Sequence, residues 1–121
     1  MAKHNDLGKN GENTALSYLQ EQGYSIIETN WRYKHLEIDI IAKLKDILCF
    51  IEVKTRKNNY FGEPCLALTK AKQKNILNAA NQYIQEHNID NPIRFDLISI
   101  IANSKKVEVE HFEDVFTSFL F

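Results

Sequence analysis

The stretch of sequence that decides the fold spans residues 36–56, which read LEIDIIAKLKDILCFIEVKTR. Two runs rich in β-branched and aromatic residues stand on either side of a polar pair, Lys45 and Asp46. Such runs predict two β-strands, Leu36 to Lys43 and Ile47 to Arg56. The polar pair between them favours a hairpin.

Charged residues alternate with apolar ones along the second of these strands. Glu52, Lys54 and Arg56 share one face, whereas Ile51 and Val53 point the other way. The alternation alone fits two interpretations about equally. One is an antiparallel strand with a solvated face, and the other is a strand that carries a chemical site.

The first strand favours a site. Asp39 stands among strong strand formers, although aspartate is depleted inside strands. If the hairpin is centred on the polar pair, Asp39 lies opposite Glu52, and Glu37 lies opposite Lys54. Like charges so placed are destabilising, and a divalent cation would remove the repulsion, since Mg²⁺ is usually held by one or two carboxylates plus waters and phosphate. The ammonium of Lys54 would then lie where a phosphate or an activated water can use it, unless the register shifts by one residue.

Periodicity and breaker residues predict the remaining elements. They are a helix from Asn5 or Asp6 to Gly23, a strand from Tyr24 to Arg32, a helix from Thr69 to His87, and strands from Arg94 to Ala102 and from Val107 to Phe112. The order α-β-β-β-α-β-β puts a helical crossover between the third and fourth strands, which implies a parallel pair. We therefore expect an α/β fold with a mixed sheet of about five strands flanked by helices, forming one domain over residues 1–121.

Glu12 lies on the stripe that the first helix is expected to bury, four residues before Leu16 and seven before Leu19. Buried carboxylates are rare unless they are paired or bound to metal. Gly11 and Ala15 beside it indicate that another backbone comes close. The alternative, of equal weight, is an exposed acid favoured by the helix dipole.

The second predicted helix opens with Lys70, Lys72 and Lys74, which oppose its dipole. An anion bound at that helix end would explain them. A solvated charge cluster is the commoner explanation for any single lysine. Gln73 in the same turn is able to hydrogen-bond a phosphate or a carboxylate.

Composition limits the class of protein. With 15 basic and 16 acidic residues, the chain lacks the basic surplus of a protein that coats nucleic acid. However, six basic residues and one acid lie between Lys54 and Lys74, and a local positive zone attracts phosphates. Cys49 and Cys65 form no disulfide framework and no metal-binding spacing, and no apolar run approaches the ~20 residues of a membrane span. We expect a cytoplasmic protein with no membrane contact.

Asp39, a spacer of a dozen residues and then Glu52-x-Lys54 resemble the core motif of the PD-(D/E)xK nuclease superfamily. The flanks extend the likeness to the YraN-like family of small bacterial proteins over roughly residues 6 to 102. The residues that carry it are Gly8, Gly11-Glu12, Ala15, Leu19, Gly23-Tyr24, Asn30, Arg32, Glu37 to Ala42, Phe50 to Arg56, Phe61-Gly62 and Arg94-Phe95-Asp96. Two positions depart from the pattern: Ile38 replaces the proline of the superfamily name, and Leu36 stands where YraN-like sequences usually carry glycine.

The resemblance implies a restriction-endonuclease-like core, related to archaeal Holliday-junction resolvases. In such sites Asp39 and Glu52, with the backbone carbonyl of Val53, bind Mg²⁺ or Mn²⁺. Lys54 orients or activates the attacking water. Glu12 completes the shell, directly or through a water.

These observations predict a metal-dependent nuclease that hydrolyses phosphodiester bonds in DNA, with branched or single-stranded DNA among the candidate substrates. Glu37, Arg56, Lys70, Lys72 and Gln73 are the candidate substrate contacts. A non-catalytic nucleic-acid-binding module that uses the same cleft is the alternative. A third possibility is an interaction protein that works through its apolar end, residues 115–121, and a homodimer is also open because many proteins of this fold are dimers.

Overall fold

The computed structural model of this protein describes residues 3–58, 62 and 68–116. Its elements follow the predicted order. They are α1 (Lys3–Glu21), β1 (Ser25–Tyr33), β2 (Leu36–Leu44), β3 (Ile47–Arg56), α2 (Lys70–Glu86), β4 (Ile93–Ala102) and β5 (Val107–Phe112). The predicted α/β class with five strands and two helices is confirmed, and α1 begins two residues before the earlier of its two predicted starts.

The ends of both helices follow from local sequence. Gly23 adopts a φ of 93° just beyond α1, and the Tyr24 N–H donates to the Leu19 carbonyl at 2.9 Å, as in a Schellman cap. At the start of α2, the Thr69 hydroxyl accepts from the Lys72 N–H at 3.2 Å. The first cap ends α1 just before β1, and the second begins α2 at Lys70.

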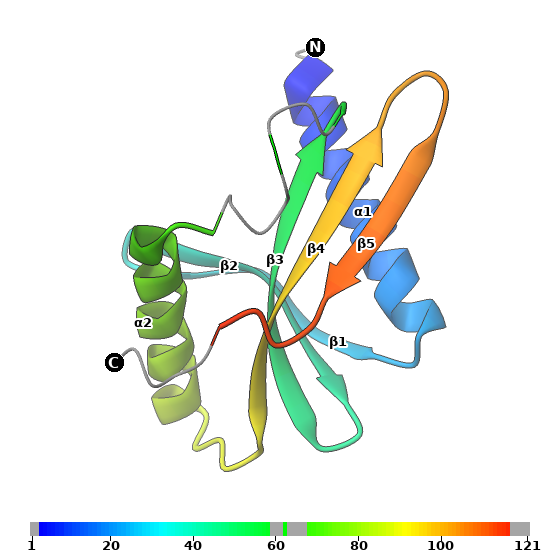
Figure 1. Cartoon of the computed structure of the whole chain (residues 1–121). Coiled ribbons are helices and arrows are strands. Elements are labelled where there is room, and N and C mark those ends of the chain that lie inside the picture. Colours follow the sequence, from blue (N-terminus) through cyan, green and yellow to red (C-terminus); the bar gives the residue numbers. More distant parts are fainter. Residues whose placement is uncertain (1–2, 59–61, 63–67, 117–121) are drawn as a thin grey trace.

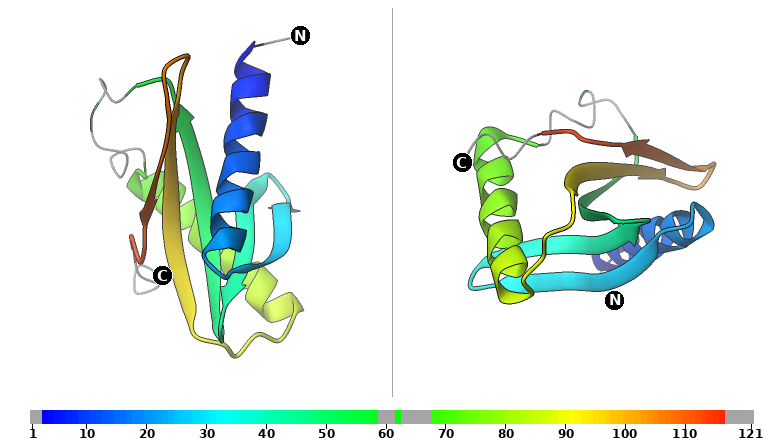
Figure 2. Two further views of the ribbon diagram at one scale, coloured as in Figure 1. Left: turned by 90° about the vertical axis from the view of Figure 1, so that its right-hand side faces the viewer. Right: turned by 90° about the horizontal axis from the view of Figure 1, so that it is seen from below.

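The sheet has the order β1-β2-β3-β4-β5 (Figure 1). β3 and β4 are parallel, and the other three neighbouring pairs are antiparallel. The mixed sheet and the parallel pair across the α2 crossover are therefore confirmed. The two helices lie on opposite faces of the sheet, as the views in Figure 2 make clear.

Two apolar clusters divide between these faces. Alternate residues of β3 belong to different clusters: Phe50 packs with α2 residues such as Leu77, whereas Ile51 packs with Ala15 and Leu19 of α1. Trp31 of β1 joins the α2 cluster and meets the Tyr83 ring edge-on at 5.2 Å between centroids. These clusters fix both helices against the sheet.

A buried polar network joins β4 to its neighbours. Asp96 is 1% exposed and accepts two hydrogen bonds from the Arg94 guanidinium, at 2.8 and 2.9 Å. His111 Nε2 lies 2.7 Å from the same carboxylate, and the Tyr18 hydroxyl lies 3.0 Å from His111 Nδ1. The pair of Arg94 and Asp96 is thus part of a larger network that links α1, β4 and β5.

The structure also describes the start of the apolar C-terminal end and one of the two cysteines. Val115 packs against the α2 cluster, and Phe116 stacks on Phe95 at 4.8 Å, so the apolar end begins as core. Residues 117–121 and Cys65 lie outside the described residues. Burial raises the pKa of the free Cys49 thiol to about 12. No helix among the described residues is long and apolar enough to span a membrane.

Candidate metal and phosphate site

The strands β2 and β3 part at the centre of the sheet. Their ladder runs from Leu44↔Ile47 to Ile40↔Ile51, which confirms the predicted register. Beyond that pair the Asp39 side chain replaces the backbone as hydrogen-bond acceptor, because its Oδ2 accepts the Val53 N–H at 2.8 Å. Figure 1 shows β2 turning away from β3 toward the N-terminal end of α2. We call this point, where Asp39 faces β3, the fork.

The carboxyls of Asp39 and Glu52 meet at the fork. Burial, the charge of Asp39 and a hydrogen bond between the two carboxyls raise the pKa of Glu52 to about 9. The Lys72 ammonium acts in the opposite direction but does not cancel these effects. In the metal-free protein at neutral pH, the pair therefore holds a proton that an ordinary glutamate would have released.

Two hollows open on either side of this carboxyl pair. One, of about 280 Å³, is lined by Glu12, Asp39, Val53, Lys54 and Thr55. The other, of about 150 Å³, is lined by His35, Leu36, Glu37, Glu52, Lys72, Asn75 and Ile76. Each hollow thus joins one carboxyl of the pair to one lysine, and residues from α1, β2, β3 and α2 converge at the fork.

The predicted pairing of Glu37 with Lys54 is wrong, because the ladder has ended before it reaches them. Glu37 instead pairs in register with Arg32 of β1, and their side chains approach to 3.7 Å. Its carboxylate borders the smaller hollow with Lys72. The divergence of the strands separates Glu37 from Lys54.

The other predicted phosphate ligands lie at different distances from the carboxyl pair or serve other contacts. Lys72 is exposed and reaches the smaller hollow, whereas Lys70 is exposed in the first turn of α2 and lines neither hollow. The Gln73 amide donates to the Leu68 carbonyl at 2.9 Å and so serves the start of the helix. Arg56 donates from Nη1 to the Gly62 carbonyl at 3.1 Å, while its buried Nε and Nη2 have no hydrogen-bond partner among the described residues. The structure therefore brings Lys72 to the carboxyl pair and leaves Lys70 and Gln73 apart from it.

Glu12 reaches the fork because α1 lies very close to β3. Gly11 is buried, and a Cβ at this position would overlap the Thr55 hydroxyl and lie 3.0 Å from the Thr55 Cβ. The next residue, Glu12, is half-buried and borders the larger hollow with Asp39. This geometry favours the interpretation of Glu12 as a site residue over that of a solvated acid.

Replacing Gly11 by alanine is expected to lower the free energy of unfolding by about 1–3 kcal/mol. In an exposed helix the same change would raise the free energy of unfolding by roughly 1 kcal/mol. A decrease would therefore show that the contact with Thr55 limits the space at this position. Urea denaturation measures the effect. Asn13→Ala on the exposed side of α1 serves as the control, and Thr55→Ala should restore part of the loss. A Gly11→Ala protein as stable as the parent would contradict this account of how α1 is placed.

Asn30 is a site neighbour that the functional analysis of the sequence missed. Its side-chain amide donates to Glu12 Oε1 at 2.6 Å, and its backbone has a φ of 51° inside β1. An asparagine within a run of strand formers was the available signal, since asparagine is depleted in strands and tolerates positive φ.

The donor set at the fork suits a hard divalent cation. It offers carboxylate oxygens from Asp39 and Glu52, and such oxygen ligands are the ones that Mg²⁺ and Mn²⁺ prefer. Val53, whose main-chain carbonyl the resemblance adds to the ligands, also lines the larger hollow. Among the described residues, no group of three His, Cys, Asp or Glu side chains is placed to hold a metal ion. Two carboxylates with waters are a usual complement for Mg²⁺, and the raised pKa of Glu52 marks a site where a cation would relieve repulsion.

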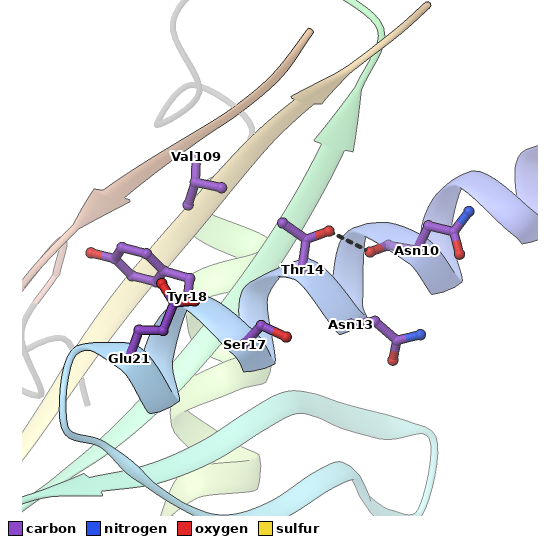
Figure 3. Close-up of a pocket in the computed structure, with 7 residues that line it drawn as sticks. All are labelled: Asn10, Asn13, Thr14, Ser17, Tyr18, Glu21 and Val109. Carbon is purple, nitrogen blue, oxygen red and sulfur yellow. Dashed lines mark hydrogen bonds between the residues drawn. The ribbon is translucent and has the colours of Figure 1, made fainter.

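A larger hollow of about 540 Å³ lies elsewhere, between the outer side of α1 and β5 (Figure 3). Its lining consists of Asn10, Asn13, Thr14, Ser17, Tyr18, Glu21 and Val109. These residues include no lysine, no arginine and none of the predicted site residues. Size alone therefore does not identify the site, whereas the convergence of carboxyls and lysines at the fork does.

The fold and the fork define this protein as a small α/β protein with a two-carboxylate site where two strands part. Over residues 11–100 the chain matches the family described as "Uncharacterised protein family UPF0102", and it belongs to that family, as the likeness to YraN-like proteins predicts. A UPF0102 protein of Flavobacterium psychrophilum is 46% identical over 119 residues, covering 98% of this chain and 100% of the relative. Another, from Bacteroides thetaiotaomicron, is 43% identical over 121 residues and covers all of both chains.

Proposed function

We propose that this protein is a metal-dependent nuclease of the PD-(D/E)xK kind, which hydrolyses phosphodiester bonds in DNA at the fork. The observation that carries the proposal is the meeting of Asp39 and Glu52 at the point where β2 leaves β3, with Lys54 beside Asp39. A purely structural protein gains nothing from two facing carboxyls that have to keep a proton. A site that binds a divalent ion does gain from them.

In this proposal Asp39, Glu52 and the Val53 carbonyl would hold Mg²⁺ or Mn²⁺. The chemistry that such an ion supplies when bound is polarisation of the phosphate and acidification of a water. The hydrogen bond from the Val53 N–H fixes the Asp39 carboxylate, so one ligand is oriented before any ion arrives. Glu12, across the larger hollow, is placed to accept a hydrogen bond from water in the site.

The lysines supply the positive charge that the phosphates require. Lys54 is half-buried in the larger hollow, where its ammonium stabilises negative charge that develops on the phosphate. Lys72 at the smaller hollow would contact a neighbouring phosphate of the same strand. Lys70 and Lys74, exposed on the same helix end, extend the positive field without touching the carboxyl pair.

The experiment that tests the proposal is cleavage of labelled duplex, single-stranded, flap and four-way-junction DNA by the purified protein. The reactions are run in Mg²⁺, in Mn²⁺ and in EDTA. We expect cleavage of at least one DNA shape with metal and none in EDTA, and the preferred shape identifies the substrate. If a well-folded protein binds DNA but cuts no shape, the alternative of a non-catalytic binding module replaces this proposal.

Replacing Lys54 by alanine is expected to lower the rate of metal-dependent cleavage about 100-fold. The free energy of unfolding should change by less than about 1 kcal/mol, because the Lys54 ammonium forms no ion pair with another residue that the structure describes. Single-turnover cleavage and urea denaturation measure the two effects. Lys105→Ala, in the exposed turn between β4 and β5, is the matched control and should cut at the parent rate.

A further inference from the structure

Asn30 has an unusual backbone conformation within β1, beside the fork. The neighbouring register pairs, Thr29↔Ile40 and Trp31↔Ile38, place its backbone opposite Asp39 of β2. Its φ of 51° is in the left-handed region, which few residues other than glycine occupy and where asparagine is several-fold enriched. The left-handed residue of β1 thus lies opposite Asp39, whose carboxylate accepts the Val53 N–H beyond the end of the β2–β3 ladder.

The Asn30 side chain reaches α1 from this position. Its Nδ2 donates to Glu12 Oε1 at 2.6 Å, which joins β1 to α1 across the larger hollow. The orientation of the amide follows from chemistry, since an ionised carboxylate only accepts hydrogen bonds and the NH₂ group must face it. Glu12 is therefore held by one polar contact from β1 while Gly11, beside it, is held against Thr55 of β3.

This contact has little to do with holding the fold together. Asn30 is exposed, and α1 is already fixed by Gly11 against Thr55 and by the buried side chains of Ala15 and Leu19. What the contact does restrict is the Glu12 side chain, which would otherwise sample several rotamers.

We propose that Asn30 is a positioning residue of the fork, whose amide holds the Glu12 carboxylate at the hollow that it shares with Asp39. Asparagine meets two requirements at once, because it tolerates a positive φ and carries a donor that glycine lacks. The inference rests on the proposed nuclease function, because its activity readout is cleavage.

Two substitutions separate the backbone requirement from the amide. Asn30→Gly keeps the left-handed backbone and removes the donor. Asn30→Asp keeps the size and the tolerance of positive φ but sets a second carboxylate against Glu12. If Asn30 serves only the shape of β1, Asn30→Gly should match the parent protein in every respect.

The experiment compares parent, Asn30→Gly and Asn30→Asp proteins by Mn²⁺ titration in a calorimeter, by single-turnover cleavage and by thermal unfolding. For Asn30→Gly we expect Mn²⁺ affinity and cleavage rate to fall about tenfold, as for other residues that orient the groups surrounding a bound metal ion. Its Tm should stay within about 2 °C of the parent, and its DNA affinity in EDTA should be unchanged. Asn30→Asp should lose at least as much activity.

A Glu12→Ala background supplies the control. If Asn30 acts through Glu12, adding Asn30→Gly to Glu12→Ala should cause no further loss, because the two residues form one unit. The inference is overturned if Asn30→Gly cuts and binds Mn²⁺ like the parent, or if it still lowers the rate in the Glu12→Ala background. Failure of the proposed function looks different, since the parent itself would then neither bind Mn²⁺ nor cut DNA, and the role assigned to Asn30 would fall with it.

Discussion

Replacing Glu52 by glutamine is expected to slow metal-dependent cleavage by about 10²–10³ and, at the same time, to stabilise the metal-free protein. Glutamine keeps the size of the side chain but cannot supply a carboxylate to the cation. Loss of about 2.7–4 kcal/mol of transition-state stabilisation corresponds to about 10²–10³ in rate. The free energy of unfolding should rise by something on the order of 2 kcal/mol at pH 8, because the folded parent must keep a proton on Glu52 that the unfolded chain releases, and glutamine avoids this cost.

The stability effect has a definite pH dependence. The pKa of Glu52 is about 9 in the folded chain, against 4.5 for an ordinary glutamate. Between these values the folded protein holds a proton that the unfolded chain has released, so the stability of the parent falls as the pH rises. Urea denaturation in EDTA should therefore show the advantage of Glu52→Gln growing from pH 5 to pH 9 and disappearing below about pH 4.5.

Two controls make this prediction specific to the fork. Glu110→Gln removes an exposed carboxylate on β5 and should change neither cleavage nor the pH dependence of stability. Added Mg²⁺ should raise the Tm of the parent but not that of Glu52→Gln, since only the parent binds it in the folded state. A Glu52→Gln protein that is less stable than the parent at pH 8 would contradict the assignment of Glu52 to a strained carboxyl pair.

Replacing Asp96 by alanine is expected to lower the free energy of unfolding by about 3–5 kcal/mol. Arg94, whose side chain is only 14% exposed, would lose the partner of its two short hydrogen bonds and keep only the exposed Glu113 carboxylate, at 3.4 Å, and the Tyr24 hydroxyl. The His111 ring and the Asp114 N–H would also lose their acceptor. Guanidinium denaturation measures the effect, and an unchanged slope with denaturant would show that the transition is still two-state.

An exposed ion pair of similar length provides the comparison. Lys106 lies 2.7 Å from Glu108 with both side chains more than half exposed, and Lys106→Ala should cost less than about 1 kcal/mol.

The stabilisation from Asp96 depends on pH. Burial alone would raise the pKa of Asp96 in the parent protein, but hydrogen bonds from His111, Arg94 and Asp114 hold this pKa below its usual value of 3.8. The stabilisation is therefore complete above pH 3.8 and is lost as the pH falls further. If Asp96→Ala lowers the free energy of unfolding by less than about 1 kcal/mol, the network does not hold β4 and β5 together.

The sequence predicted the order of elements and the register of the central hairpin. Both depend on local signals: the period of the apolar residues, the break at Gly23, and the polar pair Lys45-Asp46 that centres the turn. Because strand pairing continues from a turn residue by residue, a correct turn places Asp39 near Glu52 without further information. The Asp39–Glu52 contact is thus the part of the site that could be predicted from the sequence.

The rest of the site depends on where the strands stop pairing, and no local signal marks that point. The parting of β2 from β3 after Ile40↔Ile51 separates Glu37 from Lys54. Likewise, the bond between Asn30 and Glu12 joins residues from different elements that meet only after α1 packs on the sheet. The capping bond of Gln73 to Leu68 is local, but the sequence does not distinguish it from a phosphate contact.

Binding of Mn²⁺ to the purified protein, measured by titration calorimetry at pH 7.5, tests most directly the claim that the fork holds a divalent cation. The account predicts binding at the fork in the parent protein and its loss in both Asp39→Asn and Glu52→Gln, with Glu110→Gln as the unaffected control. Binding should also release protons, because Glu52 must give up the one that it holds in the metal-free protein. A parent protein that binds no Mn²⁺, or one whose affinity survives both fork substitutions, would contradict the account.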